Sequence, residues 1–319
     1  MNKFYLDFEK PIIDIEKRIE EIRMLMSGEQ LEVSAELKKL EDKLRRKRRE
    51  IFSKLSPWQR AQLARHPYRP YTSDYIARIF DDFTELKGDR YFADDPAIIA
   101  GIGRLNGTPL AVIGQEKGRQ TDEKIKRNFG MPQPEGYRKA LRIMRLAEKF
   151  HLPVITFIDT PGAFPGIGAE ERGQAEAIAH NLQEMSALKT PIIAIVIGEG
   201  GSGGALGLGV ADVVYMLENS IYSVISPEGC AAILYKDAAL APQAAAALKI
   251  TAADLYELKV IDGIIKEPEG GAHNDYDLIA KRVKKTLAAS IKQLSEFPPE
   301  KLIDVRYEKL KTIGVFSRD

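Results

Sequence analysis

The stretch that decides the fold spans residues 191–234 and reads PIIAIVIGEGGSGGALGLGVADVVYMLENSIYSVISPEGCAAIL. Its first eight residues form an apolar, mostly β-branched run, which is typical of a strand buried on both faces. Five glycines then fall within residues 198–204, so this turn has few Cβ atoms and can bring backbone N–H groups close to a ligand. The small residues 205–211 predict a short helix after the turn.

The junction of turn and helix is a candidate site. The first turn of a helix leaves N–H groups without partners inside the helix, and these donors favour negative charge. Such donors can hold the negative charge that develops on a carbonyl oxygen during a reaction. We therefore expect an oxyanion site where the buried strand meets the short helix.

Two other motifs overlap the same turn. Gly198, Gly200 and Gly203 spell the dinucleotide fingerprint G-x-G-x-x-G, with Glu218 about twenty residues further on. A dinucleotide unit needs a crossover helix of about ten residues or more before its second strand. The strand VVYML instead follows a short piece rich in alanine and glycine, which disfavours this interpretation.

The turn also contains G-x-S-x-G centred on Ser202, and Asp262 and His273 follow in the order of a hydrolase triad. His273 lies in the polar segment GGAHND, where nothing in the sequence holds it rigidly. Four histidines scattered over the chain satisfy such an order by chance. Close packing alone would explain Gly207 and Gly209, but it explains five glycines in seven residues less well.

Composition excludes several classes of function. The 319 residues include 47 basic and 46 acidic side chains, so no overall charge favours nucleic acid or a membrane surface. A single cysteine excludes a disulfide framework and a cysteine-rich metal site, and Cys230 reads as a small buried residue. The N-terminus has no signal-like apolar region, and no apolar run reaches the length of a membrane helix. We expect a cytoplasmic protein.

The first part of the chain predicts a helical hairpin. Its two apolar stripes are separated by a break at residues 27–28, and they consist of Ile12, Ile15, Ile19, Ile22 and Met26, then Leu37, Leu40, Leu44, Ile51 and Leu55. The basic cluster at residues 38–49 could contact nucleic acid, but a charge run on a helix is usually a solvated face. We expect this hairpin to pack on another domain or subunit.

The chain then divides into two predicted parts. Residues 65–71, RHPYRPY, contain two prolines and predict an extended connector. Residues 72–74 offer an N-cap for a helix that ends at Gly88. We therefore predict a helical N-terminal extension over residues 1–87, which serves packing or assembly, and a mixed α/β domain over residues 88–319.

A unit of apolar strand, glycine-bearing turn and helix recurs in the second part. Asn106-Gly107 joins two apolar runs and predicts a hairpin. The three copies of the unit begin at Leu110, Pro153 and Pro191, and their turns are expected to meet at one edge. Later elements are predicted as a strand at 221–226, helices capped by Ser226 and by Thr251 with Asp254, a strand at 260–265, and helices over 278–294 and 300–313.

The segment 115–145 is rich in lysine and arginine. Clustered cations beside an oxyanion site suit a phosphate-bearing or carboxylate-bearing ligand. Lys124, Lys126 and Arg127, in a loop bounded by glycine and proline, are the candidates for contact with such a ligand. Lys139 and Arg142 are expected to lie on a solvated helix face.

Long motifs along the chain resemble one family. They are ARHPYRPYTSDYI, NFGMPQPEGYRKALR, ITFIDTPGAFPGIGAEERGQ, VIGEGGSGGALGLGVADVVYML and YSVISPEGCAAIL. Over essentially the whole chain, the sequence resembles the carboxyltransferase alpha subunits of bacterial acetyl-CoA carboxylase. The resemblance implies a crotonase-type α/β fold, a superhelix of stacked strand-strand-helix units preceded by the helical extension.

The resemblance also implies a reaction and its partners. The carboxyl group of carboxybiotin, carried by the biotin carrier protein, moves to acetyl-CoA and gives malonyl-CoA for fatty acid synthesis. The alpha subunit would work as an α2β2 heterotetramer with a beta subunit, which carries the zinc-binding cysteines, so that no metal is expected in this chain. A biotin carboxylase partner would use the ATP.

Site residues follow from the same resemblance. Gly203 and Gly204 would donate backbone N–H groups to the ureido oxygen of biotin, while a glycine pair on the beta subunit would hold the thioester enolate. The biotin pocket would be completed by Gly162 and Gly166, and by Gly200, Gly201 and Ser202. The released biotin nitrogen would take the methyl proton, so no protein base is required.

An alternative from the same fold stays open. A self-contained crotonase enzyme, such as an acyl-CoA hydratase or isomerase, would place an acidic catalytic residue near its oxyanion loop. Glu199 and Glu228 are the nominal candidates. Turnover of an enoyl-CoA by the isolated chain would favour this alternative.

Overall fold

The structure is a computed structural model that describes residues 4–25 and 31–314. Its centre is one sheet in the order β1-β2-β3-β4-β5-β6-β8, with β7 paired to β5. The strands are β1 (Asp81–Glu85), β2 (Ile98–Leu105), β3 (Thr108–Gln115), β4 (Val154–Thr160), β5 (Ile192–Gly201), β6 (Val213–Leu217), β7 (Ile221–Ser223) and β8 (Gly263–Ile265). From β3 onward all neighbouring strands run parallel, whereas β1, β2 and β3 are antiparallel.

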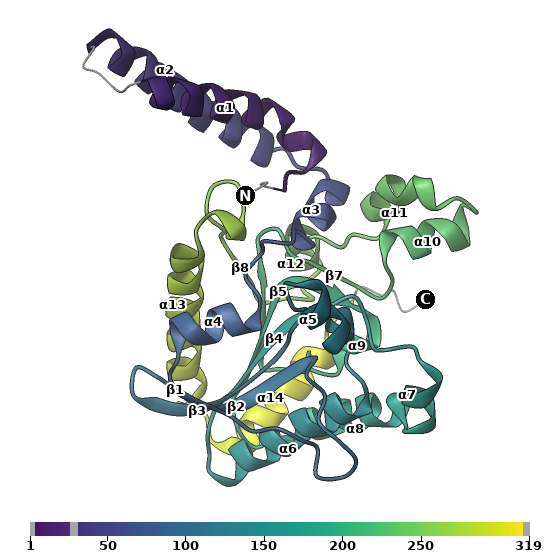
Figure 1. The fold of residues 1–319 in the computed structure, drawn as a ribbon. Helices are drawn as coiled ribbons and strands as arrows, with labels where there is room; N and C mark the ends of the chain where they lie inside the picture. Colours follow the sequence, from purple (N-terminus) through teal and green to yellow (C-terminus); the bar gives the residue numbers. More distant parts are fainter. Residues whose placement is uncertain (1–3, 26–30, 315–319) are drawn as a thin grey trace.

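Helices cover both faces of this sheet (Figure 1). Alternate residues of the strands point to opposite faces, so Ala194 and Val196 join one hydrophobic cluster and Ile193 and Ile195 the other. The first cluster packs under α6 (Pro134–Lys149) and α8 (Gln174–Ala187). The second packs under α4 (Thr72–Ile79) and α13 (Tyr276–Leu294). Burial on both faces explains the continuous apolar run of β5.

The predicted helical hairpin is confirmed. Helices α1 (Lys10–Leu25) and α2 (Leu31–Phe52) pack along each other and project from the body of the molecule (Figure 1). The predicted break at residues 27–28, and Met26, lie outside the described residues. Helix α3 (Pro57–Ala64) and helix α4 pack on the strands of the sheet. Within the segment before residue 87, α1 and α2 therefore project from the molecule, whereas α3 and α4 belong to its body. The boundary at residues 87 and 88 stays a prediction.

The helix predicted to continue to Gly88 is wrong. Helix α4 ends at Ile79, and residues 81–85 form β1, which pairs with β2. Space for this strand comes from Gly101 on β2, where an added Cβ would overlap the Thr84 carbonyl oxygen and the Phe83 ring. This long-range fit of Phe83 against a glycine outweighs the local helical pattern.

Several local predictions are confirmed. Asn106 and Gly107 both have positive φ and join β2 to β3, as expected for a two-residue hairpin. The Ser226 hydroxyl accepts a hydrogen bond from the Gly229 N–H (3.0 Å) at the start of α10 (Pro227–Leu234), and Thr251 caps α12 (Ala252–Glu257). The remaining helices are α5 (Thr121–Lys126), α7 (Ile167–Glu171), α9 (Ser202–Leu206), α11 (Ala241–Ala247) and α14 (Pro299–Lys311), with short 3-10 turns at Asp7–Glu9, Asn128–Gly130, Ala238–Leu240 and Ala272–Asn274.

Helix α9 begins earlier than expected. The predicted helix covered residues 205–211, whereas the observed helix covers Ser202–Leu206 and includes the glycine pair. Ser202 starts it with a left-handed backbone, φ 52°. The turn from strand to helix is therefore made within a single residue, and Gly203 and Gly204 form the first helical turn instead of preceding it.

Candidate active site

The glycine turn lies at the end of β5, after the point where this strand changes its pairing partner from β6 to β7. Residues 193–196 of β5 pair with β6, but residues 199–201 pair with β7, and β4 runs along the other side of β5. The loops that follow β3, β4 and β5 leave the same edge of the sheet because these strands are parallel. The expectation that the turns of the three repeated units meet at one edge is thus confirmed.

Two glycines of the turn pack directly on the loop after β4. An added Cβ at Gly204 would overlap the backbone of Gly162 and Ala163, and one at Gly201 would overlap the Pro161 carbonyl. At Gly203, in contrast, the nearest atoms to an added Cβ belong to the Ile178 side chain, at 3.8 and 4.0 Å. Close contact with the neighbouring backbone therefore requires glycine at position 204, whereas a Cβ at position 203 would make only an ordinary van der Waals contact.

Two side chains hold the first turn of α9 in place through hydrogen bonds to one of its carbonyl groups. The Gly204 carbonyl accepts hydrogen bonds from the Gln115 amide (2.7 Å) and the Tyr137 hydroxyl (3.4 Å). Gln115 also accepts a bond from the Asp159 N–H (2.9 Å), so one side chain ties β4 to α9. The N–H groups of Gly203 and Gly204 belong to the first turn and have no partner within the helix. The hydrogen bonds to the Gly204 carbonyl fix the first turn, and with it these two donors, which makes the turn a candidate oxyanion site.

The structure brings together most of the predicted pocket residues. Gly200, Gly201 and Ser202 are continuous with the glycine pair, and the Gly162 N–H is held by the Thr160 hydroxyl (3.1 Å) beside Gly204. Gly166 lies further along that loop, as the N-cap of α7. Next to Ser202 is a recess of about 250 Å³ with a mainly apolar lining, formed by Ser202, Leu206, Tyr222, Ser223, Val224, Leu255 and Val260.

A cluster of charges at this edge of the sheet was not predicted. Arg65 binds both Glu199 (2.6 Å) and Glu228 (2.6 Å), while Lys117 binds Asp159 (2.7 Å) and lies 3.6 Å from Glu199. The local signal is that Lys117, Asp159 and Glu199 each lie within two residues of the end of a strand. Their pairing depends on strand order, which one sequence does not reveal.

The predicted cationic residues have different surroundings from those expected. Lys124 and Lys126 lie on α5 and Arg127 is its C-cap, so they belong to a helix instead of a loop. Arg127 donates to the Pro96 carbonyl (2.6 Å), and Lys126 is exposed. Contact of these three residues with an anionic ligand stays a prediction.

The solvated face predicted for Lys139 and Arg142 is wrong. Lys139 is fully buried and donates to the Asp94 carboxylate (2.6 Å) and the Asp95 carbonyl (2.7 Å), and Arg142 donates to the Gly88 carbonyl (3.0 Å). The segment between β1 and β2 folds over α6, and its carboxylates and carbonyls take these cations as partners.

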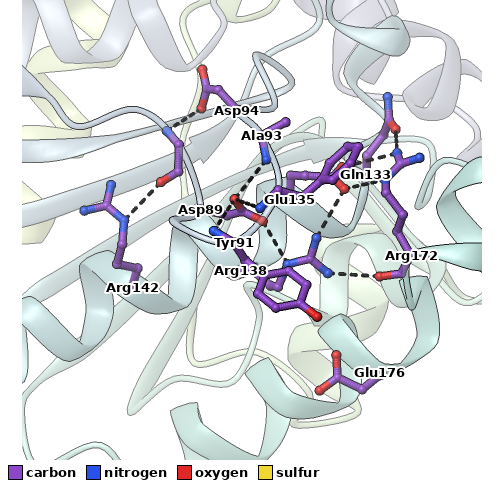
Figure 2. A network of polar contacts seen from close by, with 12 residues as sticks. Asp89, Tyr91, Ala93, Asp94, Gln133, Glu135, Arg138, Arg142, Arg172 and Glu176 are labelled. Carbon is purple, nitrogen blue, oxygen red and sulfur yellow. Dashed lines mark hydrogen bonds and ion pairs between the residues drawn. The ribbon is translucent and has the colours of Figure 1, made fainter.

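Figure 2 shows Arg142 and Asp94 within a larger network of polar contacts, which joins the β1–β2 segment to α6 and α7. Arg138 donates to Asp89 (2.9 Å), and Arg172 donates to Glu135 (2.6 Å). Asp89 also accepts three backbone N–H groups, those of Tyr91, Phe92 and Ala93. Burial alone would raise the pKa of the Asp89 carboxyl, but these donors outweigh burial and lower it. The network fixes the segment before β2 on the helices that flank the site.

The hydrolase and dinucleotide interpretations find no support in the geometry. His273 stacks on His66, with ring centroids 3.9 Å apart, and burial lowers the pKa of His273 to about 3. Asp262 binds the Val214 N–H (2.6 Å) and Lys309. Within residues 31–314, no hydrogen bond joins Ser202, Asp262 and His273. The helix after the glycine turn has five residues, too few for a dinucleotide crossover. The expectation that nothing holds His273 is wrong, because the His66 ring fixes it.

Cys230 is buried, as expected, in the small cluster between α10 and α11. In the described part of the chain no helix is long and apolar enough to cross a membrane. Among these same residues, no group of three or more His, Cys, Asp or Glu side chains is placed to hold a metal ion.

The burial of Glu116, just after β3, predicts a pH-dependent stability. Burial raises the pKa of its carboxyl from 4.5 to about 7, although hydrogen bonds from Ser73 and the charge of Arg127 oppose this. The stabilisation from this raised pKa is fully present below pH 4.5 and is lost as the pH rises through about 7. Glu116→Gln keeps the shape without the charge, so it should be more stable than the wild type at pH 8, by about 1–3 kcal/mol, and nearly equal at pH 4.5.

Urea unfolding of both proteins at pH 4.5 and pH 8 measures this effect. At each pH, the free energy of unfolding of the wild type is subtracted from that of Glu116→Gln. Comparing the two results isolates Glu116, because the other titrating groups are the same in both proteins. If Glu116→Gln changed the free energy of unfolding by the same amount at both pH values, the result would contradict the burial of an uncharged Glu116.

Comparisons with known proteins agree with this geometry. Residues 5–314 match the family described as acetyl co-enzyme A carboxylase carboxyltransferase-like. The chain is 60% identical over 314 residues to the acetyl-coenzyme A carboxylase carboxyl transferase subunit alpha of Alcanivorax borkumensis, covering 98% of this chain and 97% of that one. It is 56% identical to the protein of the same name from Geobacter metallireducens, covering 99% of each.

Solved structures share the fold. Transcarboxylase 12S has a TM-score of 0.59 at 18% identity, over 71% of this chain and 42% of that chain. A Pseudomonas malonate decarboxylase hetero-dimer has a TM-score of 0.52 at 16% identity, over 66% of this chain and 84% of that one. The fold is that of the crotonase-like carboxyltransferases, as predicted. Within this class, the chain belongs to the acetyl-CoA carboxylase carboxyltransferase alpha subunit family.

Proposed function

We propose that this chain transfers a carboxyl group from carboxybiotin, held by the biotin carrier protein, to acetyl-CoA, and so forms malonyl-CoA in the first committed step of fatty acid synthesis in the cytoplasm. The observation that supports this most directly is the first turn of α9, whose Gly203 and Gly204 N–H groups are unpaired within the helix and fixed through the Gly204 carbonyl. Nearly full-length similarity to alpha subunits of acetyl-CoA carboxylase supports the choice of substrates.

The reaction needs two sites for negative charge. Cleavage of the C–N bond in carboxybiotin releases CO2 and places charge on the ureido oxygen, and loss of a methyl proton from acetyl-CoA places charge on the thioester oxygen. In this proposal the N–H groups of Gly203 and Gly204 bind the ureido oxygen, and a glycine pair of the beta subunit binds the enolate. The biotin nitrogen takes the methyl proton, and the enolate carbon then bonds to CO2.

No carboxylate of this chain is needed as a base. Glu199 and Glu228, the candidates of a hydratase, are both engaged by Arg65. Burial opposes ionisation of Glu228, but hydrogen bonding and the charge of Arg65 lower its carboxyl pKa overall. A carboxylate in this state is a poor proton acceptor near pH 7. The ion pairs therefore favour carboxyl transfer over a self-contained crotonase activity.

The surroundings of the turn suit the biotin side of the reaction. The walls of the pocket in this proposal are Gly162, Gly166, Gly200, Gly201 and Ser202. Lys124, Lys126 and Arg127 on and after α5 are proposed to meet the anionic groups of a substrate.

The proposal includes partners. A beta subunit carrying zinc would complete an α2β2 assembly, with the biotin carrier protein and an ATP-using biotin carboxylase supplying carboxybiotin. The subunit names of the relatives support a complex of several chains.

Malonyl-CoA formation from carboxylated carrier protein and acetyl-CoA tests this function, with this chain or the beta subunit omitted in turn. Product formation only when both chains are present is the expected result. Hydration of an enoyl-CoA by the isolated chain would contradict the proposal and support the hydratase alternative.

A further inference from the structure

We propose that Arg65 is a positioning residue, which fixes the oxyanion turn by clamping Glu199 of β5 to Glu228 of α10. The inference rests on the proposed function, since it assigns a role to a residue that does not touch the substrates. Arg65 is the C-cap residue of α3, a helix that packs on β5 and β7, and its side chain reaches Glu199 of β5.

The contacts of Arg65 are those of a rigid clamp. Its Nε and one terminal nitrogen both donate to the same oxygen of Glu199, at 2.9 and 2.6 Å, and its other terminal nitrogen donates to Glu228 (2.6 Å). The side chain of Glu199 is 8% exposed. Burial alone would lower the pKa of the Arg65 guanidinium, but the two carboxylates outweigh burial and raise it. The planar fork of arginine suits this geometry, which lysine would not reproduce.

Glu199 passes this restraint to the glycine turn. It precedes Ser202 by three residues, and its backbone N–H donates to the Asp159 carboxylate (2.9 Å). Lys117 bridges from the other side, with its Nζ 2.7 Å from Asp159 and 3.6 Å from the second oxygen of Glu199. Both the backbone and the carboxylate of Glu199 are therefore held, and only Gly200 and Gly201 separate Glu199 from the left-handed Ser202.

The remainder of the turn is held by its backbone: Gly200 and Gly201 pair with β7, and Gly201 and Gly204 pack on the loop after β4. Glycines have no side chains that could anchor them, so side-chain restraints on the Gly203 and Gly204 N–H groups act at the ends of the segment. Gln115 holds the helical end, through the Gly204 carbonyl, and the Arg65 clamp holds the strand end. Because an oxyanion site requires donors within a few tenths of an ångström, releasing one end should slow the reaction without weakening acyl-CoA binding.

The test uses Arg65→Gln in the assembled complex, with Arg60→Gln as a matched control. Arg60 lies on α3 and donates to the Asn219 side chain (2.6 Å) and the Glu218 carbonyl, not to the turn. We expect Arg65→Gln to lower kcat at least about tenfold with KM for acyl-CoA within about twofold of the wild type. Arg60→Gln should leave both constants within about twofold.

Two further readouts separate positioning from a general loss of stability. Adding ethylguanidinium to Arg65→Ala should restore part of kcat, because the cation can occupy the emptied space between the two carboxylates. In a Glu199→Gln background, Arg65→Gln should lower kcat less than about twofold further, because the two residues act through one contact.

Equal effects of Arg65→Gln and Arg60→Gln, or fully additive effects of Arg65→Gln and Glu199→Gln, would overturn the inference. So would a rise in KM at unchanged kcat. An inactive wild-type complex would instead overturn the proposed function itself, so the two failures are distinguishable.

Discussion

Gly204→Ala is expected to lower the rate of carboxyl transfer by about 10²- to 10³-fold, the effect of losing one oxyanion donor. An added Cβ at this position would overlap the backbone of Gly162 and Ala163, so α9 and the loop after β4 cannot keep their present contact. The N–H groups of the first turn would move with the backbone. The measurement is kcat of the assembled complex, with assembly confirmed by size-exclusion chromatography.

Gly203→Ala is the matched control. It makes the same chemical change one residue earlier, keeps its own N–H group, and places the new methyl group no closer than 3.8 Å to the rest of the chain. We expect it to keep at least about a third of the wild-type rate. A Gly204→Ala complex within about threefold of the wild type would show that close contact between α9 and Gly162 is not needed for catalysis.

Arg306→Met is expected to lower the free energy of unfolding by about 3–5 kcal/mol, the usual effect of leaving one partner of a buried ion pair alone. Arg306 on α14 is fully buried and donates to both oxygens of Asp212, each at 2.9 Å. It also donates to the carbonyls of Met185, Leu188 and Thr190. One side chain thus fastens α14 to the end of α8 and to the loops before β5 and β6. Urea unfolding measures the change.

Lys309→Met on the same helix is the control for this prediction. Lys309 donates to the Asp212 carbonyl (3.0 Å) and contacts Asp262, but it is only partly buried. Its loss should cost about 1 kcal/mol or less. Similar costs for the two variants would contradict the assignment of Arg306 as the main fastening of α14.

The sequence predicts the parts of the fold that depend on local pattern. The apolar run of β5, the Asn106-Gly107 hairpin and the Ser226 cap each need only neighbouring residues, and all three are observed. The helix predicted to reach Gly88 failed because β1 forms against Gly101, which lies far along the chain. Lys139 was misplaced for the same reason, since its partners come from another segment.

The residues of the candidate site also fall into two groups, those that a local pattern predicts and those that depend on contacts between distant segments. Glycines between a predicted strand and a predicted helix mark a candidate oxyanion site, and the structure has the strand-to-helix turn at these glycines. Gln115, Lys117 and Arg65 lie at a distance in the chain, and only the order of the strands brings them to the turn. The start of α9 at Ser202 could not be predicted either, because a left-handed residue followed by two helical glycines has no distinctive local pattern.

In the proposed function, this chain supplies one half of a shared carboxyltransferase site. The most direct measurement is the reverse half-reaction, carboxyl transfer from malonyl-CoA to free biotin or biocytin, run with this chain alone, with the proposed beta subunit alone, and with both. Activity in the mixture only is the predicted result. Activity in the isolated chain, or none in a well-formed mixture, would contradict the claim of a shared site.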